Sequence, residues 1–295
     1  MNQKLYFISY GDKHYSIQKK RIGYQAKKFK IFNNVILYSQ NSLDNRFLNK
    51  FSNLFDDNIG GGYWVWKSYI VLKTFNLMKE GDILLYVDSG STLNVSGKKR
   101  LIDYIDKLNS SGKSILCFQM NNLVEKEWTT KQVFEALNVN NKPHITNTPQ
   151  IMGGVFLVKK SNESIKFFQN FQAHVHADNN LITNYYQDVQ DTKFKSCRHD
   201  QSLFSVMCKL TNQLILEDET YFLDNSHLQY DYPILTVRDG PYSLWQKIKF
   251  YVFYPYNIQK EIYFGNKKFY YKRKSKLQQK ILYKLKNLRE LIRKF

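Results

Sequence analysis

Cysteine is scarce in this sequence: Cys117, Cys197 and Cys208 are the three among 295 residues. An odd and sparse set is not a disulfide framework, and it indicates a reducing compartment. Long apolar runs are also missing, since no stretch approaches the roughly 20 apolar residues of a membrane-spanning helix. The first apolar run is short and ends at Gly11-Asp12, unlike the core of a signal peptide. We therefore expect a cytoplasmic protein, either free or peripheral on the inner face of a membrane.

Two common phosphate-binding signatures are absent as well. The sequence has neither a Gly-x-x-x-x-Gly-Lys-Ser/Thr loop nor a Gly-x-Gly-x-x-Gly fingerprint, which argues against P-loop and dinucleotide-binding proteins. His174, His176 and Asp178 have the residue types of a metal site, but no further ligands accompany them, and a polar loop or frayed helix end is the better interpretation. The cysteines lack the paired spacing of a zinc site.

Positive charge is in excess and unevenly placed. The chain has 44 Lys and Arg against 25 Asp and Glu, a net charge of +19. Residues 241–295 hold 15 of the basic residues and two acidic ones, a balance of +13, which leaves +6 for residues 1–240. The composition shift near Gly240-Pro241 predicts two parts: a main domain over residues 1–240 and a basic, aromatic, helical tail over residues 241–295.

The last 20 residues of the tail have the pattern of a basic amphipathic helix. Apolar residues recur there at helical spacing, with Lys and Arg on the other faces: Leu277, Ile281, Leu285, Leu288, Ile292 and Phe295. Such a helix, preceded by the aromatic-basic run 267–274, suits an anionic membrane surface. The alternative is an ordinary solvated helix that packs its apolar stripe on the main domain.

Strand and helix patterns alternate through about residue 210. An α/β fold with a mostly parallel central sheet flanked by helices is therefore predicted. The predicted strands are 4–10, 34–39, 83–87, 114–120 and 154–158, and the predicted helices are 16–28, 63–79, 101–108, 130–137, 161–171 and 200–209.

A carboxylate follows the most apolar of these strands. Residues 83–87 run directly into Asp88-Ser89-Gly90. Ligands of open α/β sheets bind beyond the carboxyl ends of the strands, and a carboxylate there can bind Mg²⁺ or Mn²⁺ together with phosphate. The alternative is that Asp88 only caps a turn, because Asp-Ser-Gly is common turn chemistry.

Three other segments accompany Asp88 in chain order. An aromatic-basic helix, with Lys67 beside tryptophans, precedes it, and a strand beginning at Gly153-Gly154 and a helix beginning at Arg198-His199-Asp200-Gln201 follow. Over roughly residues 3–240, this order resembles that of the GT-A fold (Rossmann-like) glycosyltransferases, in particular small bacterial and viral enzymes that build capsule or lipopolysaccharide glycans.

The resemblance implies a hexosyltransferase that uses a nucleotide-sugar donor, UDP-linked by default. Its implied binding residues are Ser9, Tyr10 and Asp12 for the base or ribose, Lys67, Asp88, Ser89 and Gly90 for the diphosphate, and Gly153 and Gly154 for the acceptor or donor sugar, with Gln201 as a supporting polar contact. The alternative for the two glycines is a simple β-bulge or bend. It also implies a divalent cation, Mn²⁺ or Mg²⁺, at Asp88. The sequence departs from the family's Asp-x-Asp motif, since Gly90 replaces the second acid, and Lys67 could neutralise the diphosphate instead.

The resemblance places the chemistry on the helix that begins at Asp200. An acidic residue there either stabilises the oxocarbenium-like charge or deprotonates the acceptor hydroxyl, which makes Asp200 the catalytic candidate, with His199 beside it. The implied acceptor is a glycan or a lipid-linked glycan in surface polysaccharide synthesis. His227 and Arg238 are interpreted as loop and turn residues.

Two other classes of function stay open. One is a basic protein that binds nucleic acid or a membrane without catalysis, and the other is an α/β nucleotidyltransferase with a similar carboxylate site. Against the first, the basic residues are concentrated in the tail and no groove-reading motif appears. We therefore expect no nucleic-acid partner.

Overall fold

The computed structural model describes residues 3–57, 59–186, 189–221 and 231–236, together with two short strands at 263–264 and 267–268. The chain forms two compact units, Met1–Asp239 and Gly240–Phe295. The predicted tail helix, His227 and Arg238 lie outside the described residues. In the second unit, β9 (Tyr263–Phe264) pairs antiparallel with β10 (Lys267–Lys268).

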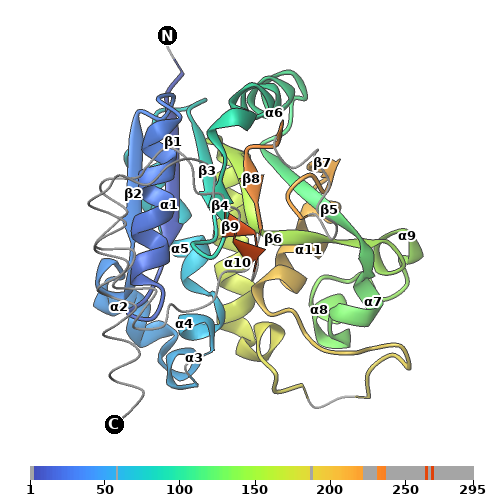
Figure 1. Ribbon diagram of the computed structural model, residues 1–295. Helices are drawn as coiled ribbons and strands as arrows, with labels where there is room; N and C mark the ends of the chain where they lie inside the picture. Colours follow the sequence, from blue (N-terminus) through green and yellow to red (C-terminus); the bar gives the residue numbers. More distant parts are fainter. Residues whose placement is uncertain are drawn as a thin grey trace, which may run out of the picture. The chain divides into compact units, whose positions relative to one another are not determined.

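The first unit is built on a six-stranded sheet with the order β2-β1-β3-β6-β5-β7 (Figure 1). All neighbouring pairs are parallel except the two that involve β6, which runs against both β3 and β5. The predicted mostly parallel α/β sheet is therefore confirmed. The strands are β1 (Leu5–Tyr10), β2 (Asn34–Tyr38), β3 (Ile83–Val87), β5 (Ile115–Val124), β6 (Pro149–Lys159) and β7 (Leu214–Glu217), and a separate small sheet pairs β4 (Thr92–Leu93) with β8 (Ile234–Leu235).

Helices cover both faces of the sheet (Figure 1). Alternate residues of each strand enter two different cores: Ile8 and Tyr86 pack in the core under α5, α10 and α11, whereas Phe7 and Leu85 pack in the core under α1 and α6. This alternation follows from the two-residue period of a strand. The helices are α1 (Ser16–Lys28), α2 (Asn45–Lys50), α3 (Ser52–Asp56), α4 (Gly60–Tyr63), α5 (Trp66–Phe75), α6 (Lys98–Ser110), α7 (Glu125–Trp128), α8 (Lys131–Ala136), α9 (Pro143–Thr146), α10 (Asn162–Ala177) and α11 (Asp200–Leu210), with 3₁₀ turns η1 (Gln40–Ser42), η2 (Val95–Gly97) and η3 (Asn179–Ile182).

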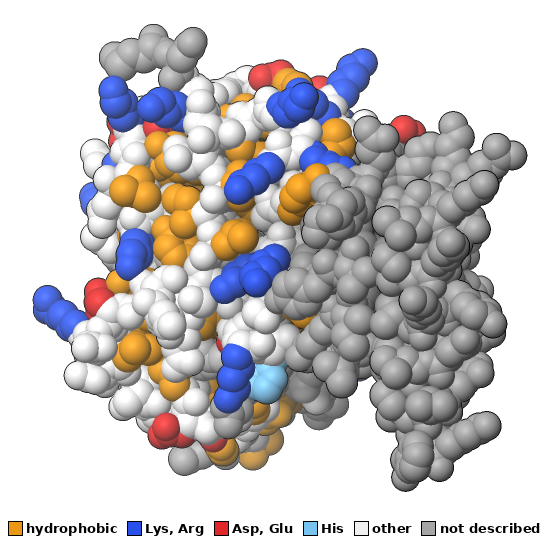
Figure 2. All heavy atoms as spheres, turned by 60° about the vertical axis from the view of Figure 1, so that its left-hand side comes forward, with side chains coloured by type: hydrophobic (Ala, Val, Ile, Leu, Met, Phe, Trp, Pro, Cys, Tyr) orange, Lys and Arg blue, Asp and Glu red, His pale blue; other side chains and the backbone are white. Residues whose placement is uncertain are grey.

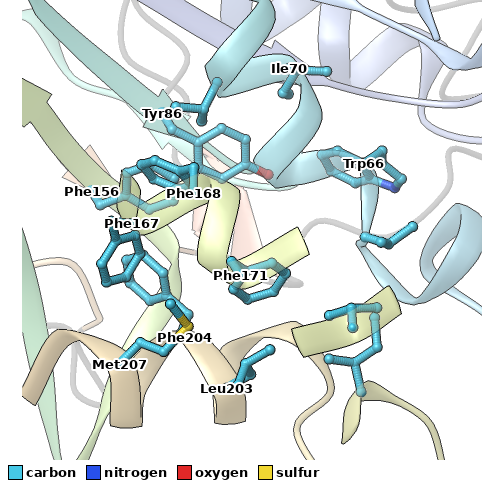
Figure 3. Close-up of a cluster of buried hydrophobic side chains, with 14 of the residues drawn as sticks. Trp66, Ile70, Tyr86, Phe156, Phe167, Phe168, Phe171, Leu203, Phe204 and Met207 are labelled. Atoms are coloured by element: carbon cyan, nitrogen blue, oxygen red, sulfur yellow. The ribbon is translucent and has the colours of Figure 1, made fainter. Parts of the chain in front are cut away.

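Aromatic rings fill the core beneath α10 and α11 (Figure 3). Tyr86 and Phe156, from adjacent strands, stack with ring centroids 4.9 Å apart. Phe156 also contacts Phe168 of α10 at 5.9 Å and Phe204 of α11 at 5.1 Å. Part of the high aromatic content is thus used to tie both helices to the centre of the sheet.

Two helices have boundaries that differ from those predicted from the sequence. The helix predicted over 63–79 spans Trp66–Phe75, because the preceding residues adopt left-handed conformations that a right-handed helix cannot include. Helix α10 runs to Ala177, so His174 and His176 lie in its last turn. Asp178 then accepts a hydrogen bond from the Asn180 backbone, in agreement with the interpretation of this segment as a helix end.

Over the part of the chain that the structure describes, no helix combines the length and apolarity that crossing a bilayer requires. On the face drawn in Figure 2, Lys and Arg side chains are interspersed with hydrophobic and polar ones.

Candidate functional site

Asp88 stands directly after β3, and neighbouring backbone fixes its place. Its backbone N–H donates to the Gly154 carbonyl at 2.8 Å, and its carbonyl accepts from Ser91 N–H at 3.0 Å. The Tyr86 hydroxyl, buried beneath it, donates to Oδ1 of Asp88. The Asp88 side chain is 40% exposed, so one side of this carboxylate faces solvent while the other is held by the fold.

Lys67, in the first turn of α5, joins three elements through one buried ammonium. Its Nζ donates to Oδ2 of Asp200 at 2.5 Å and to the Gly153 carbonyl at 2.8 Å. The same Nζ lies 3.9 Å from Oδ1 of Asp88 and 5.2 Å from the centre of the Tyr86 ring. An ammonium with these partners orients Asp200 and offers little to an incoming phosphate, so the geometry favours a positioning role for Lys67.

Asp200 begins α11 and is almost fully buried. Burial raises the pKa of its carboxyl to about 6, against the opposing effect of Lys67 and with a smaller contribution from Asp88. Its position at a helix N-terminus also favours negative charge. The result is a buried carboxylate that titrates near neutral pH, beside a fixed cation.

The raised pKa of Asp200 predicts a specific dependence of stability on pH. Because the folded-state pKa lies above the ordinary value of 3.8, the stabilising contribution is complete below about pH 4 and is lost as the pH rises through about 6. A change of this size corresponds to about 3 kcal/mol. Urea unfolding of wild type and Asp200→Asn between pH 4 and 7 measures it, since asparagine does not titrate. Identical pH slopes in the two proteins would contradict the assignment.

Gly153 and Gly154 allow close approach of two site residues to β6. A Cβ on Gly154 would lie 2.8 Å from Oδ2 of Asp88, and one on Gly153 would lie 3.0 Å from Cβ of Gln201. Gln201 Oε1 in turn accepts from the Gly153 N–H at 3.1 Å. The paired glycines are thus needed to seat Asp88 and α11 against the strand.

Behind Gln201 lies a buried polar network. Gln201 Nε2 donates to Gln150 Oε1 at 2.6 Å, and Gln150 lies 3.4 Å from Oε2 of Glu125. Glu125 is fully buried and forms an ion pair with Lys209 of α11 at 2.7 Å. Thr129 and Ser205 also donate to the Glu125 carboxylate. These bonds fix the orientation of α11, the helix that carries Asp200.

Ser9, Tyr10 and Asp12 lie at the end of β1, next to β3, and each has internal partners. The Ser9 hydroxyl donates to the Val87 carbonyl at 2.7 Å. The Tyr10 ring stacks on Trp66 with centroids 3.7 Å apart. Asp12 Oδ1 accepts from the backbone N–H groups of the two residues that precede α1, at 2.8 and 3.0 Å. A role in binding a base or ribose stays a prediction.

His199 has an unusual backbone conformation, with φ 56° and ψ −131°. Its Nδ1 lies 3.1 Å from the Ile182 carbonyl, so Nδ1 carries the proton in a neutral ring. Burial lowers the pKa of the imidazole. The ring stacks with Trp64 at 5.3 Å and tilts against Tyr63 at 5.3 Å. His199 therefore belongs to an aromatic neighbourhood beside Asp200.

Arg21 is a residue of the site that the sequence did not single out. It lies on α1, is almost fully buried, and its Nη2 donates to the Ser91 carbonyl at 2.7 Å and to the Ser89 carbonyl at 3.4 Å. The guanidinium thereby holds the loop that follows Asp88, including Gly90. No sequence signal marks it, because its partners are backbone carbonyls about 70 residues away.

The side chains around Asp88 show whether the protein could hold the predicted divalent cation. No group of three or more His, Cys, Asp or Glu side chains that could hold an ion occurs among the described residues. Asp88 offers one partly exposed carboxylate, and Gly90 offers none. This set does not make a metal site from protein ligands alone. It does fit a Mg²⁺ or Mn²⁺ ion that takes one protein carboxylate and completes its shell with phosphate and water.

No protein-family model matches the sequence, and no curated protein matches it. Solved structures with a related arrangement of elements include three glycosyltransferases. A glycosyltransferase involved in the glycosylation of the major capsid of PBCV-1 is 11% identical, with 79% of this chain and 92% of that chain covered and a TM-score of 0.47. The bifunctional glycosyltransferase WbbM is 12% identical (TM-score 0.47), over 80% of this chain and 46% of that one.

The third structure is the galactosyltransferase LgtC in complex with donor and acceptor sugar analogues. It is 12% identical, with 74% of this chain and 75% of that chain covered and a TM-score of 0.41. Identities this low, with TM-scores below 0.5, carry nothing about activity over to this chain. Its function has to be inferred from its own residues.

Proposed function

We propose that this protein is a glycosyltransferase that moves a sugar from a nucleotide-sugar donor to an acceptor hydroxyl. The observation that carries the proposal is the Asp88–Lys67–Asp200 cluster at the end of β3. Two carboxylates from a strand end and a helix start lie on either side of one buried ammonium, with distances from Nζ of 3.9 and 2.5 Å. This is the edge of an α/β sheet at which nucleotide-bearing ligands bind.

The cluster suits the charge changes of glycosyl transfer. The bond between the anomeric carbon and the diphosphate oxygen breaks, a bond to the acceptor oxygen forms, and the acceptor proton passes to a base. Asp200, held by Lys67, supplies negative charge where the oxocarbenium-like carbon develops positive charge. Asp88 faces the diphosphate, where Mg²⁺ or Mn²⁺ bound to it would neutralise the leaving group.

Calorimetric titration tests the proposal. UDP, UDP-sugars and sugars activated by other nucleotides are titrated into wild type, Asp88→Asn and the control Asp103→Asn, with and without Mn²⁺. We expect saturable binding of at least one nucleotide sugar by wild type and by the control, in which an exposed carboxylate on α6 is replaced. Asp88→Asn should bind about tenfold more weakly or worse. If no nucleotide sugar binds to wild type, the proposed function is wrong.

Gly154→Ala should weaken donor binding without unfolding the protein. The added Cβ displaces the Asp88 carboxylate, which lies 2.8 Å from its position, and a loss of about 1.4 kcal/mol corresponds to tenfold in affinity. Gly153→Ala is the matched comparison, since its Cβ meets the α11 side chain and backbone at 3.0 and 3.1 Å. That variant should lose about 1–3 kcal/mol of folding stability. The reverse pattern in titration and thermal unfolding would contradict these assignments.

We further propose a glycan or lipid-linked acceptor in surface polysaccharide synthesis, with the basic tail attached to the cytoplasmic face of a membrane. The charge of residues 241–295 supports this. Replacing Lys272 and Arg273 with glutamine should reduce partitioning onto vesicles that contain phosphatidylserine by about 1 kcal/mol per residue. Neutral phosphatidylcholine vesicles are the control. Equal partitioning of wild type and variant would rule out electrostatic attachment through these residues.

A further inference from the structure

A strained backbone segment lies between α3 and α5. Gly60, Gly61, Gly62, Tyr63 and Trp64 all have positive φ, between 49° and 99°. For residues other than glycine, this conformation is energetically unfavourable, because Cβ comes too close to the following carbonyl oxygen. Tyr63 and Trp64 bear that cost. His199, whose ring contacts both of theirs, also has positive φ, with ψ at −131°. Strain of this kind persists where the surroundings hold it, and it concentrates at functional sites.

A carboxylate and two tyrosine hydroxyls complete this neighbourhood. Tyr63 donates from its hydroxyl to Oδ2 of Asp57 at 2.7 Å. The Tyr185 hydroxyl lies near the same carboxylate, and its interaction with Asp57 raises the pKa of this hydroxyl. Tyr185 is 58% exposed, so its ring is held at one end and open to solvent over much of its surface. We refer to Asp57, Tyr63, Trp64, Tyr185 and His199 as the aromatic cluster.

The aromatic cluster adjoins the candidate active site through His199. The ring of His199 packs on Trp64, while the next residue, Asp200, is hydrogen-bonded to Lys67. A molecule lying on the aromatic cluster would therefore lie beside Asp200. Asp88, at which the donor diphosphate is proposed to bind, is not among the residues of the aromatic cluster.

We infer that the aromatic cluster is the acceptor subsite and that it takes a sugar ring, an inference that rests on the proposed function. The apolar face of a pyranose packs on the exposed Tyr185 ring and the partly buried Trp64 ring, and its hydroxyls donate to Asp57. Amphipathic aromatic rings and one carboxylate match a ligand with apolar faces and polar edges. A lipid chain at the same place would cover the Asp57 carboxylate without offering a donor to its remaining acceptor sites, which is costly for a charged group.

Saturation-transfer NMR tests the subsite with methyl α- and β-glycosides of glucose, galactose, mannose and N-acetylglucosamine. The full chain is measured with saturating UDP, first as wild type and then as Tyr185→Ala, Tyr185→Phe and Asp57→Asn. We expect at least one glycoside to bind saturably to wild type and about tenfold more weakly to Tyr185→Ala and Asp57→Asn. Tyr185→Phe keeps the ring and should lose less. UDP affinity should stay within twofold in all three.

A second tyrosine–carboxylate pair, Tyr69 with Asp44, provides the matched control for Asp57. Tyr69 donates from its hydroxyl to Asp44 at 2.8 Å, so Asp44→Asn alters a similar carboxylate–tyrosine contact and should leave glycoside binding unchanged. The inference is overturned if UDP binds but no glycoside does, or if glycosides bind Tyr185→Ala and Asp57→Asn as tightly as wild type. Farnesyl phosphate binding that depends on Tyr185 would also overturn it. Failure of every nucleotide and nucleotide sugar to bind is a different result, which refutes the proposed function itself.

Discussion

Asp200→Asn is expected to lower the rate of sugar transfer by about 10²–10⁴-fold. Asparagine keeps the size of the side chain and an oxygen that can accept from Lys67, but it removes the charge beside the reacting carbon. Lys67 retains Asp88 at 3.9 Å as a partner, so the fold should persist with reduced stability. The rate is measured with the nucleotide sugar that binds in the titration screen, well below the unfolding temperature of the variant.

The pH profile distinguishes Asp200 from a merely structural residue. Since burial holds the pKa of its carboxyl at about 6 in the free protein, wild-type kcat/KM should rise as the pH passes through about 6 and the carboxyl ionises. Lys67→Met removes the cation that lowers this pKa, and the rising limb should move to higher pH. Asp103→Asn, with its carboxylate on the exposed surface of α6, is the control. Unchanged kcat in Asp200→Asn would exclude a role in the chemistry.

Lys209→Met should destabilise the first unit by about 3–5 kcal/mol, because it leaves the Glu125 carboxylate buried without its cation. Glu125 is fully buried and Lys209 nearly so, with 2.7 Å between Nζ and Oε1. Burial already lowers the pKa of Lys209, which reflects the cost of placing a charge there. Calorimetry should show a fall in the unfolding temperature of roughly 10 °C.

The double variant Glu125→Gln/Lys209→Met distinguishes the interaction between the two charges from the cost of burying each charge. With neither charge buried, the double variant should recover part of the stability that Lys209→Met loses. Comparison with the two single variants then gives the coupling energy of the pair. Lys131 and Glu135 form an exposed pair at 3.4 Å, so Lys131→Met should change stability by no more than about 0.5 kcal/mol. Equal effects at the buried and exposed pairs would show that the Glu125–Lys209 bond contributes little.

Sequence patterns located the segments of the candidate site but could not give their contacts. Asp88 is predicted from its place after an apolar strand, which is a local signal, whereas the role predicted for Asp200 comes from the resemblance in the order of the segments. The bond between Lys67 and Asp200 joins residues 133 positions apart, and the same side chain could equally have met a phosphate. Only the packing of α5 and α11 against β6 gives its Nζ a carboxylate and a carbonyl as partners.

The left-handed backbone of residues 60–64 is a second feature that the sequence predicts only in part. Three consecutive glycines predict a turn, because glycine adopts positive φ without steric cost. Nothing in the sequence predicts that Tyr63 and Trp64 continue the same conformation. Their rings contact His199, a residue 135 positions beyond Trp64. Their left-handed conformations make the helix begin at Trp66 and not at the predicted residue 63.

The sequence by itself determined the sheet-and-helix alternation, the carboxylate after β3 and the concentration of charge in residues 241–295, because apolar periodicity and composition are properties of neighbouring residues. The tertiary structure decided the reversed direction of β6, the burial of Lys67 and Arg21, and the meeting of His199 with Trp64. Those features depend on which surfaces pack together. For a buried ion pair, the free energy gained by contact must offset desolvation, and that balance exists only once the chain has folded.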